Sequence, residues 1–346
     1  MSGRSRGCVS HALRTALLLA LGACATTGGG QGDSAQKLPA IVDPAIRAGA
    51  PTLLIAMPSS VNFMEVRKSL VSEVQSKFNV QTFIVGPQTR ASDLAAAIRA
   101  AKPACVVLMN NATMALYRQY QMVPSTDETP PVVLLMASFL EEVQPLIRRS
   151  TGIAYEVPGI TAFVNLRLVM SGAVNRVGVV YRPAFRRFVE RQTALAARER
   201  IEVVSTSVPN DFSPTVLRDA LHRLASGKKL DAIWLLNDNA LVRDAELLDD
   251  AWRAETTAAK VPLIVGVPNF VDQSAPLGAL AVVPDHEALG LQAANLIFDL
   301  LDNHWHVEGH GVELPLSVKT VVDVPMFRST FGLRPDALKH IDKAME

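Results

Sequence analysis

The sequence predicts an α/β fold of two lobes, each built on a parallel sheet covered by helices. Three observations predict it. Short apolar runs alternate along the chain with longer amphipathic segments, which is typical of strands and helices that follow one another. Several of these runs are apolar at consecutive positions, as expected for strands that are buried on both faces. The chain has 346 residues, which is more than one hydrophobic core usually supports.

The first lobe begins near Thr52. Residues 53–57 form an apolar run that predicts a strand, and the next segment places Val66, Leu70, Val74 and Phe78 four residues apart, which predicts a helix. The strand and helix pattern then repeats over residues 80–85 and 91–101, 104–109 and 113–121, and ends with a run at 132–136.

The rhythm breaks near residues 155–159 and then resumes, which predicts a second lobe. Ser213 and Pro214 are a good cap and first-turn pair for a helix that ends at Gly227. The other expected helices and strands of this lobe are 161–171, 177–181, 185–200, 201–207, 232–236, 241–258, 263–267 and 279–283.

The N-terminus predicts a lipoprotein export signal over residues 1–23. Arg4, Arg6 and Arg14 precede and accompany a short apolar segment at 16–21, and small residues lead to Cys24. We expect Cys24 to be acylated, palmitate included, and residues 24–50 to be a flexible tether rich in Gly, Thr, Ala and Pro. The alternative is an ordinary secretory signal with an incidental cysteine.

Composition narrows the class of protein further. Removal of residues 1–23 takes three of the 34 basic residues and none of the 33 acidic ones, which leaves 31 against 33, a formal charge of −2. This balance does not predict a nucleic-acid surface. If Cys8 leaves with the signal and Cys24 is acylated, Cys105 is the one free thiol, so an internal disulfide is not expected. We also expect membrane association through lipid rather than through a spanning helix.

Polar residues follow the predicted strands of the first lobe at their carboxyl ends, where open parallel sheets bind ligands. Hydroxyl and amide groups there can hold a carboxylate, but the same residue types cap helices, so both readings stay open. The candidates are Ser59, Ser60, Asn62, Asn110, Asn111, Thr113 and Ser138.

The second lobe offers a comparable set. Asp238 is its one acid, and it comes directly after an apolar run, so it either binds a ligand ammonium group or caps the helix that follows. On the first reading, Asp238→Asn would weaken an amine-bearing ligand by about 2 to 4 kcal/mol and barely alter folding. The other candidates are Tyr181, Arg182, Asn237, Asn239, Pro268, Asn269 and Phe270.

Other polar clusters favour structural readings. The tract of His304, His306, Glu308 and His310 lies in a predicted loop without partner ligands elsewhere, so we expect no metal site and no cofactor. Catalytic motifs such as a nucleophile elbow or a phosphate loop are missing from the sequence, which argues against an enzyme. His222 and His286 are expected on helix surfaces. A basic series along one helix is read as a solvated face, or else a docking surface, and comprises Arg186, Arg187, Arg191, Arg198 and Arg200.

Three passages resemble a known family, the substrate-binding lipoproteins of ABC transporters, which includes binders of aromatic amino acids. They are residues 150–155 (STGIAY), 231–239 (DAIWLLNDN) and 278–294, from GALA through PD to LGLQAA. The tail 318–333, ending in FGL, is similar to the family's closing segment. The resemblance implies two Rossmann-like lobes joined by a hinge, the periplasmic-binding-protein type I fold. The expected lobes are 51–154 with about 284–310, and 155–283 with about 311–346.

The resemblance also implies ligand contacts at Asp238, at the turns of Ser59–Ser60 and of residues 111–113, and at Ser138. Family members often place an aromatic residue and glycine where this chain has Val282 and Val283, so the ligand class stays open. Aromatic residues at strand ends line a pocket or belong to the core: Tyr155, Tyr181, Trp234 and Phe270.

The expected function is capture of a small molecule, an amino acid or similar, between the two lobes for uptake by an ABC permease. We expect the protein to be a monomer that is tethered on the periplasmic side of the inner or outer membrane. The alternative is a cell-envelope lipoprotein that uses the fold for protein interaction or regulation. Ala25 favours it, because an aspartate after the lipidated cysteine would hold the protein at the inner membrane in many Gram-negative bacteria. An envelope hydrolase is a third alternative.

Overall fold

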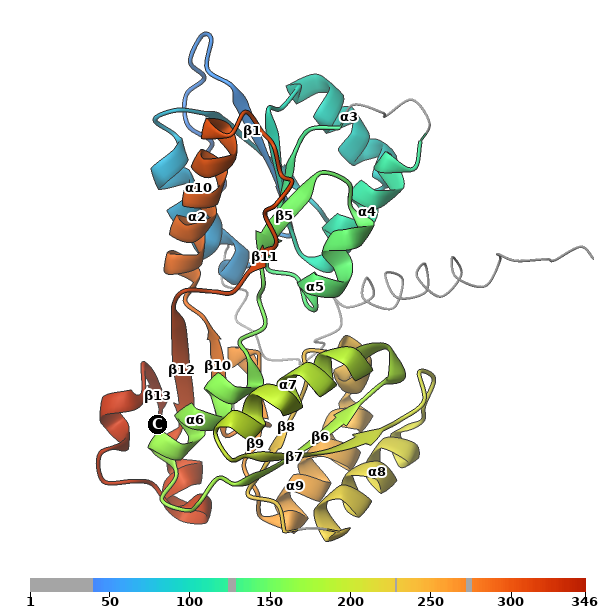
Figure 1. The fold of residues 1–346 in the computed structure, drawn as a ribbon, viewed down its shortest axis with the longest axis vertical. Coiled ribbons are helices and arrows are strands. Elements are labelled where there is room, and N and C mark those ends of the chain that lie inside the picture. The colour runs from blue at the N-terminus through green and yellow to red at the C-terminus, as the bar shows by residue number, and fades with distance from the viewer. Residues whose placement is uncertain (1–39, 124–128, 228, 272–275) are drawn as a thin grey trace, which may run out of the picture. The chain divides into compact units, whose positions relative to one another are not determined.

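The computed structural model describes residues 40–123, 129–227, 229–271 and 276–346 (Figure 1). The predicted signal peptide, Cys24 and the first part of the predicted tether lie outside these residues. The chain divides into two compact units, and it passes from one to the other after Tyr155, Asp285 and Leu316. Unit 1 therefore comprises residues up to 155 together with 286–316, and unit 2 comprises 156–285 together with 317–346. We expected these passages near residues 154, 283 and 310.

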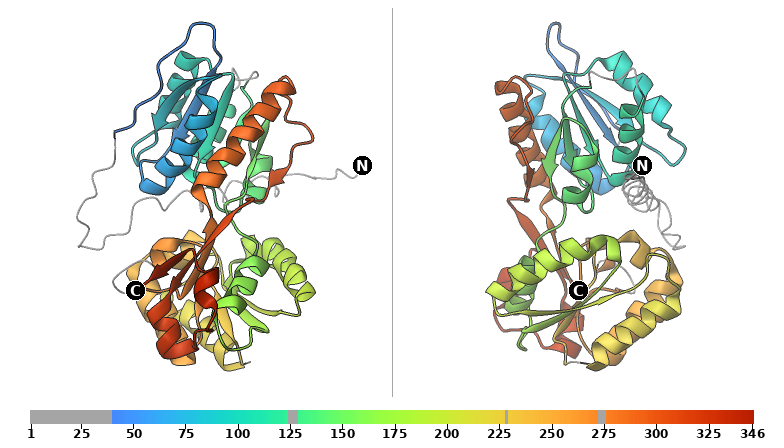
Figure 2. Two further views of the ribbon diagram at one scale, coloured as in Figure 1. Left: turned by 90° about the vertical axis from the view of Figure 1, so that its left-hand side faces the viewer. Right: turned by 45° about the vertical axis from the view of Figure 1, so that its right-hand side comes forward.

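Unit 1 is built on a six-stranded sheet in the order β11-β5-β4-β3-β1-β2, in which every pair is parallel. Helices connect the strands and lie beside the sheet (Figure 2). The strands are β1 (Thr52–Met57), β2 (Asn79–Ile84), β3 (Cys105–Met109), β4 (Val132–Leu135), β5 (Ser150–Ile153) and β11 (Val312–Glu313). The helices are α2 (Val61–Val74), α3 (Ala91–Ala101), α4 (Asn111–Gln121), α5 (Leu140–Val143) and α10 (His286–Asp302).

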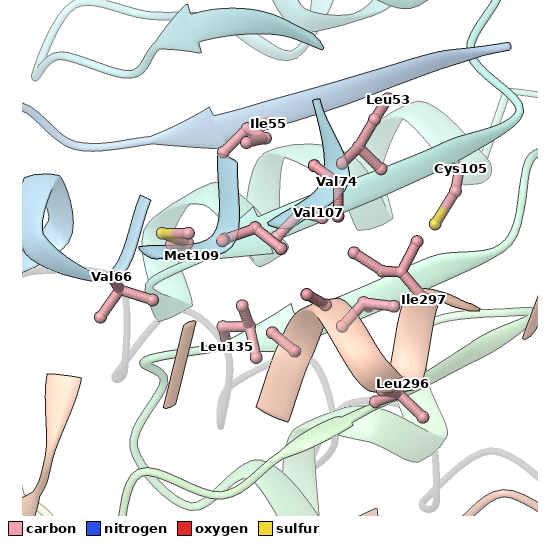
Figure 3. Packing of buried hydrophobic residues seen from close by; sticks show 14 of the residues in the cluster. Leu53, Ile55, Val66, Val74, Cys105, Val107, Met109, Leu135, Leu296 and Ile297 are labelled. Atoms are coloured by element: carbon pink, nitrogen blue, oxygen red, sulfur yellow. The ribbon is translucent and has the colours of Figure 1, made fainter. Parts of the chain in front are cut away.

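The core of unit 1 forms where α2 and α10 pack on the sheet (Figure 3). Leu53 and Val107 from the strands and Val66 and Ile297 from the helices are fully buried. Gly290 allows the two helices to approach, since a Cβ there would lie 2.6 Å from the carbonyl oxygen of Val66. The helix that returns to unit 1 late in the chain is therefore part of its central packing.

Unit 2 has a seven-stranded sheet in the order β13-β12-β10-β9-β8-β6-β7. The strand β12 pairs antiparallel with β10, and the other pairs are parallel, so the predicted parallel sheet contains one antiparallel pair. The strands are β6 (Arg176–Tyr181), β7 (Glu202–Ser207), β8 (Ala232–Trp234), β9 (Leu263–Val265), β10 (Leu280–Pro284), β12 (Val318–Asp323) and β13 (Lys343–Met345). The main helices are α6 (Gly159–Val169), α7 (Arg186–Arg198), α8 (Pro214–Gly227) and α9 (Ala254–Ala259).

The prediction of a single helix over 241–258 is wrong, because two separate helical segments begin in this part of the chain. Asp238 accepts a hydrogen bond from the amide of Ala240 and begins a short 3-10 turn at Asn239–Val242. Asp244 accepts one from the amide of Leu247, where a π-helical stretch, Leu247–Arg253, leads into α9. Two capping aspartates thus divide what the apolar spacing alone predicts as continuous.

An N-terminal strap, residues 40–50, is fastened to unit 1 by partly buried polar contacts. Asp43 accepts hydrogen bonds from Arg67 and from both the amide and the hydroxyl of Thr82. Asn79 bonds the backbone of Arg47 in both directions and the carbonyl of Ala50. The strap therefore belongs to unit 1 from residue 43 onward.

No helix within the described parts of the chain is long and apolar enough to cross a membrane.

Candidate functional site

The carboxyl ends of β3 and β4 bring together the polar residues predicted for the first lobe. Asn111, at the start of α4, donates from Nδ2 to the carbonyl of Ser138, and its Oδ1 accepts from the amide of Ser138, at 2.9 and 2.8 Å. This reciprocal pair joins the loop after β4 to the helix after β3. Asn111 is 7% exposed, so the two bonds are shielded from water and hold the loops together.

Thr113 lies in the first turn of α4, and its hydroxyl has no hydrogen-bond partner among the described residues although the residue is 0% exposed. Asn110 caps the same helix, because its Oδ1 accepts from the amide of Ala112 at 2.7 Å. Capping therefore accounts for Asn110, and it does not account for Thr113. A buried hydroxyl without a partner costs about 1–3 kcal/mol, so Thr113 is an unusual group for a structural role.

The backbone at this edge is held in left-handed conformations by residues other than glycine. Asn110 has φ +83°, and Met136 and Phe139, on either side of Ser138, have φ +51° and +55°. Left-handed backbone costs such residues about 1 kcal/mol or more and is found preferentially at functional sites. Three strained residues around Asn111 and Ser138 mark this edge as a candidate binding site.

The turn after β1 is also at this edge but is less constrained. Ser59 is exposed, and Ser60 occupies the cap position of α2 without a side-chain capping bond. Asn62 is half-buried on the first turn of α2. The capping alternative for Ser60 is therefore not observed, and the three polar residues follow a strand that is hydrogen-bonded to β3.

In unit 2 the corresponding edge is dominated by an ion pair that the sequence did not predict. Arg182, after β6, donates from Nε and Nη2 to the two carboxylate oxygens of Asp238, after β8, each at 2.6 Å. The two residues are 4% and 0% exposed. The Arg182 guanidinium also lies 5.4 Å from the centre of the Phe185 ring. A ligand ammonium at Asp238 would have to share these oxygens or displace Arg182.

The buried pair changes the expectation that Asp238→Asn would barely alter folding. Asp238 both compensates the Arg182 charge and caps the turn at Ala240, so its carboxylate serves the fold of unit 2. The sequence does show one arginine and one aspartate that each follow a predicted strand. It does not show that these two strands are neighbours in the sheet, and without the strand order the ion pair cannot be predicted.

The remaining candidates of unit 2 are dispersed. Tyr181 is half-buried at the end of β6, and Asn269 is exposed in the turn Pro268–Phe270. Trp234 is buried, with its ring 5.4 Å from that of Phe163 and 6.1 Å from that of Phe188. The core reading of Trp234 is therefore the one that its contacts support.

A polar cluster that the sequence did not predict lies where the chain leaves and re-enters unit 1. His286, the first residue of α10, bonds the hydroxyl of Tyr155 through Nε2 at 3.1 Å and a carboxylate oxygen of Glu65 through Nδ1 at 2.8 Å. The expectation that His286 lies on a helix surface is wrong, because the residue is 9% exposed and packs against the Tyr155 ring. His222 does lie exposed, beside Glu255.

Within the described residues, no group of three or more His, Cys, Asp or Glu side chains is placed to hold a metal ion. Cys105 is fully buried in β3, and burial raises the pKa of its thiol to about 12. Burial likewise raises the pKa of the Tyr117 hydroxyl on α4.

Comparison with known proteins identifies the architecture. No protein-family model matches the chain. No curated protein matches it either. Similar solved structures are an ABC domain in complex with L-Trp from Streptococcus pneumoniae (17% identity, TM-score 0.54, 85% of this chain and 100% of that one) and a conserved domain protein from Vibrio cholerae (15%, 0.57, 86% and 100%). A third is a substrate-binding protein with adhesive properties from Clostridium difficile, in its ligand-free, open form (13%, 0.61, 86% and 99%).

Of these three structures, one is described as an ABC domain in complex with L-Trp and one as a substrate-binding protein. The likeness extends over both units, and the two α/β sheets match in kind. The protein thus has the type I periplasmic-binding-protein fold, the fold of ABC-transporter substrate-binding proteins.

Proposed function

We propose that the protein is a solute-binding lipoprotein that captures a small carboxylate-bearing solute, such as an amino acid, for uptake by an ABC transporter. The observation that carries the proposal is the buried, unpartnered hydroxyl of Thr113 in the first turn of α4. A ligand carboxylate there would receive a hydrogen bond from that hydroxyl and would lie at the positive end of the helix dipole.

The surrounding residues support a built site rather than an incidental gap. The Asn111–Ser138 pair joins the loop after β4 to the start of α4, the helix that carries the hydroxyl, and the strained residues Asn110, Met136 and Phe139 lie next to this pair in the chain. Preformed loops lower the entropy that binding would otherwise cost. In the proposal, Ser59 and Ser60 belong to the polar edge of unit 1, and Tyr181, Asn269 and the Arg182–Asp238 pair form the polar edge of unit 2.

The similar structures agree with this class of ligand in part. The Streptococcus pneumoniae domain was solved with L-Trp, an α-amino acid with a carboxylate. In the present chain, Arg182 already neutralises Asp238, so we propose that the ligand carboxylate is recognised in unit 1 and that Asp238 acts by positioning the loop after β8. The proposal includes lipidation at Cys24 and a location on the periplasmic side of a membrane.

A second candidate function is protein interaction at the cell envelope without transport. Ala25 after Cys24 favours it, since this pair permits sorting to the outer membrane. The Clostridium difficile protein of similar fold is described as having adhesive properties, which gives one instance of such use.

Thermal unfolding with a panel of amino acids and other small carboxylates tests the proposal. A ligand present at 100 times its Kd stabilises the folded state by about 2.7 kcal/mol, which a melting curve detects. We expect Thr113→Val to lower the affinity for the stabilising solute at least tenfold. The matched control is Thr193→Val, whose hydroxyl donates to the carbonyl of Val189 on α7, and it should leave the affinity unchanged.

Two outcomes separate the candidates. A solute that stabilises the wild type and the control but not Thr113→Val supports the site in unit 1. Stabilisation by no compound in the panel favours the interaction module. Incorporation of labelled palmitate into the full chain, and its loss in Cys24→Ala, tests the lipid anchor separately.

A further inference from the structure

The strand at one margin of the unit 2 sheet is long and uncovered. Edge strands present unpaired backbone N–H and C=O groups, so folded proteins usually keep them short or cover them. In unit 1 the edge strands are β11, which has two residues, and β2, whose Thr82 amide is bonded by Asp43 of the strap. In unit 2 they are β13, which has three residues, and β7, which has six.

The outer side of β7 carries three residues whose backbone groups are free. The amides of Glu202 and Val208 donate to carbonyls at the two ends of β6. Because alternate residues of a parallel strand bond the same neighbour, Val203, Ser205 and Ser207 direct both N–H and C=O away from β6. No hydrogen bond from any other part of the described chain reaches these groups. We call this row the open edge.

The open edge lacks the features that usually protect an exposed strand. Residues 203–207 include no proline and no charged residue, and Glu202 before them is held by Arg176 of β6 at 2.8 Å. The register with β6 is continuous over six residues, so no bulge turns the strand away. Ser205 and Ser207 are exposed. The open edge can therefore pair with another strand.

The helices that contact β7 are α7 and α8, and Figure 1 shows the strand between them. On α7, the Phe188 ring packs against Trp234 of β8, which lies on the other side of β6 from β7. The flank of α7 that is turned toward the open edge is therefore the opposite one. It has one cation, one acid and two small residues: Arg186, Glu190, Thr193 and Ala197.

The flank of α8 beside the open edge is also neutral. His222 on α8 bonds Glu255 of α9, the helix between β8 and β9, so this side of α8 faces away from β7. The opposite flank contains Val216, Asp219 and Arg223. Val216 is 37% exposed, and a partner at the open edge would cover it. With one cation and one acid on each flank, the helices carry no net charge that would repel a copy of the same surface.

We propose that two copies of the chain associate through the open edge, with β7 of each copy antiparallel to β7 of the other and Ser205 facing Ser205. Facing residues of this kind exchange both backbone bonds. Val203 of each copy then faces Ser207 of the other, so the three pairs form about six hydrogen bonds and join the two seven-stranded sheets. This dimer replaces the expected monomer, and it does not rest on the proposed solute binding.

The side chains between the bonded pairs suit this arrangement. Val204 of one copy faces Thr206 of the other, which is a pair of β-branched residues of the kind that stabilises antiparallel strands. Glu202 faces Val208, so no like charges lie opposite each other.

Other registers form fewer bonds. A shift that centres the pair on residue 204 places Ser207 opposite Ile201, whose amide already donates within its own chain. A shift to residue 206 places Val203 opposite Pro209, which has no amide hydrogen. The open edge thus fits a copy of itself best at Ser205. The alternative reading, a hydrated edge strand of a monomer, predicts no self-association.

Sedimentation equilibrium of the chain from residue 24 onward, with Cys24→Ser in place of the anchor, separates these readings. Every described contact lies within residues 40–346, so this chain keeps the described fold. We expect the dimer fraction to rise with protein concentration up to about 1 mM, a range that detects a Kd of the same order.

A proline variant locates the surface. Ser205→Pro removes an amide hydrogen that points away from β6, so it breaks no bond within unit 2, and its ring occupies the place of the facing strand. It should weaken dimer formation at least tenfold. The matched control is Ser205→Ala, which keeps the amide and should leave association unchanged. Melting curves check that both variants are folded.

A cysteine pair tests the register without a disruptive change. Facing residues of a bonded antiparallel pair have Cα atoms about 5.5 Å apart, which suits a disulfide. Ser205→Cys should therefore form a disulfide-linked dimer under mild oxidation. Ser207→Cys is equally exposed but would lie more than about 10 Å from its equivalent, so it is the matched control and should not cross-link. The native Cys105 is fully buried.

A monomer at every concentration would overturn the proposal, even if the open edge binds a strand of another protein. Equal association of Ser205→Pro and Ser205→Ala, or equal cross-linking at residues 205 and 207, would also overturn it. Thr113→Val should lose solute affinity and keep the dimer, so failure of the proposed function and failure of this dimer are distinguishable.

Discussion

The carboxyl edges of the two units use polar residues in opposite ways. In unit 1 the edge is neutral at its centre, and the Thr113 hydroxyl is left without a partner. In unit 2 the edge contains two full charges, and Arg182 and Asp238 satisfy each other. Both edges are formed by strands that are followed by loops and helices, so the architecture alone does not determine which edge has unpaired hydrogen-bonding groups. The side chains that follow each strand determine this.

The largest expected effect is the loss of the buried charge pair in unit 2. Asp238→Asn leaves the guanidinium of Arg182 buried without a counter-charge, which should destabilise unit 2 by about 3–5 kcal/mol. Urea denaturation in a Trp305→Phe background, followed by tryptophan fluorescence, measures it, because the two remaining tryptophans, Trp234 and Trp252, lie in unit 2.

Two variants bracket that result. Arg182→Met/Asp238→Asn should recover much of the loss, because it removes the uncompensated charge and keeps the cap at Ala240. Glu202→Gln breaks the Arg176–Glu202 pair, whose side chains are 37% and 44% exposed, and should cost less than about 1 kcal/mol. A fully stable Asp238→Asn that has lost solute affinity would instead assign the carboxylate to the ligand.

The second effect concerns the loops of unit 1. Asn111→Ala removes both hydrogen bonds to the Ser138 backbone and should cost about 1–3 kcal/mol, because it leaves buried backbone groups unpaired. Hydrogen exchange of the Ser138 amide should rise in this variant. Asn62→Ala, at a half-buried position on the same edge, serves as the control and should leave that exchange unchanged.

The third effect is a pH dependence of stability that comes from the buried core of unit 1 rather than from its polar edge. The folded state raises the pKa of Cys105 from 9.0 to about 12, so the folded protein keeps a proton that the unfolded chain releases. Stability attributable to this thiol is complete below pH 9 and falls as the pH rises toward 12. Between pH 8.5 and 10 we expect a loss of about 1 kcal/mol, measured as the difference between the wild type and Cys105→Ala.

The smallest expected effect is at Thr113 in the absence of ligand. Its hydroxyl has no partner to lose, so Thr113→Val should change the free energy of unfolding by no more than about 1 kcal/mol and is expected to be neutral or stabilising. A substantial destabilisation in denaturant would show that the hydroxyl makes a structural bond and would remove the main support for the site.

Local patterns in the sequence sufficed for most of the framework. The apolar runs that predict β1, β3, β4 and β6 are confirmed, because strands buried on both faces leave a continuous signal. The signal fails where the order of strands matters. The Arg182–Asp238 pair and the Tyr155–His286–Glu65 cluster join residues between 56 and 221 positions apart, which spacing along the chain cannot reveal. Asn111 and Ser138 were predicted individually, but their mutual hydrogen bonds depend on β3 lying next to β4.

The antiparallel strand β12 has a practical consequence for how the chain can be shortened. It occupies an interior position between β10 and the three-residue strand β13, and every residue of β10 is buried. Truncation after Leu316 would remove β12 and make β10 an apolar edge strand. Such an exposed edge strand promotes intermolecular strand addition and precipitation. Fusion partners and purification tags therefore belong after Glu346, where only a short margin strand precedes them.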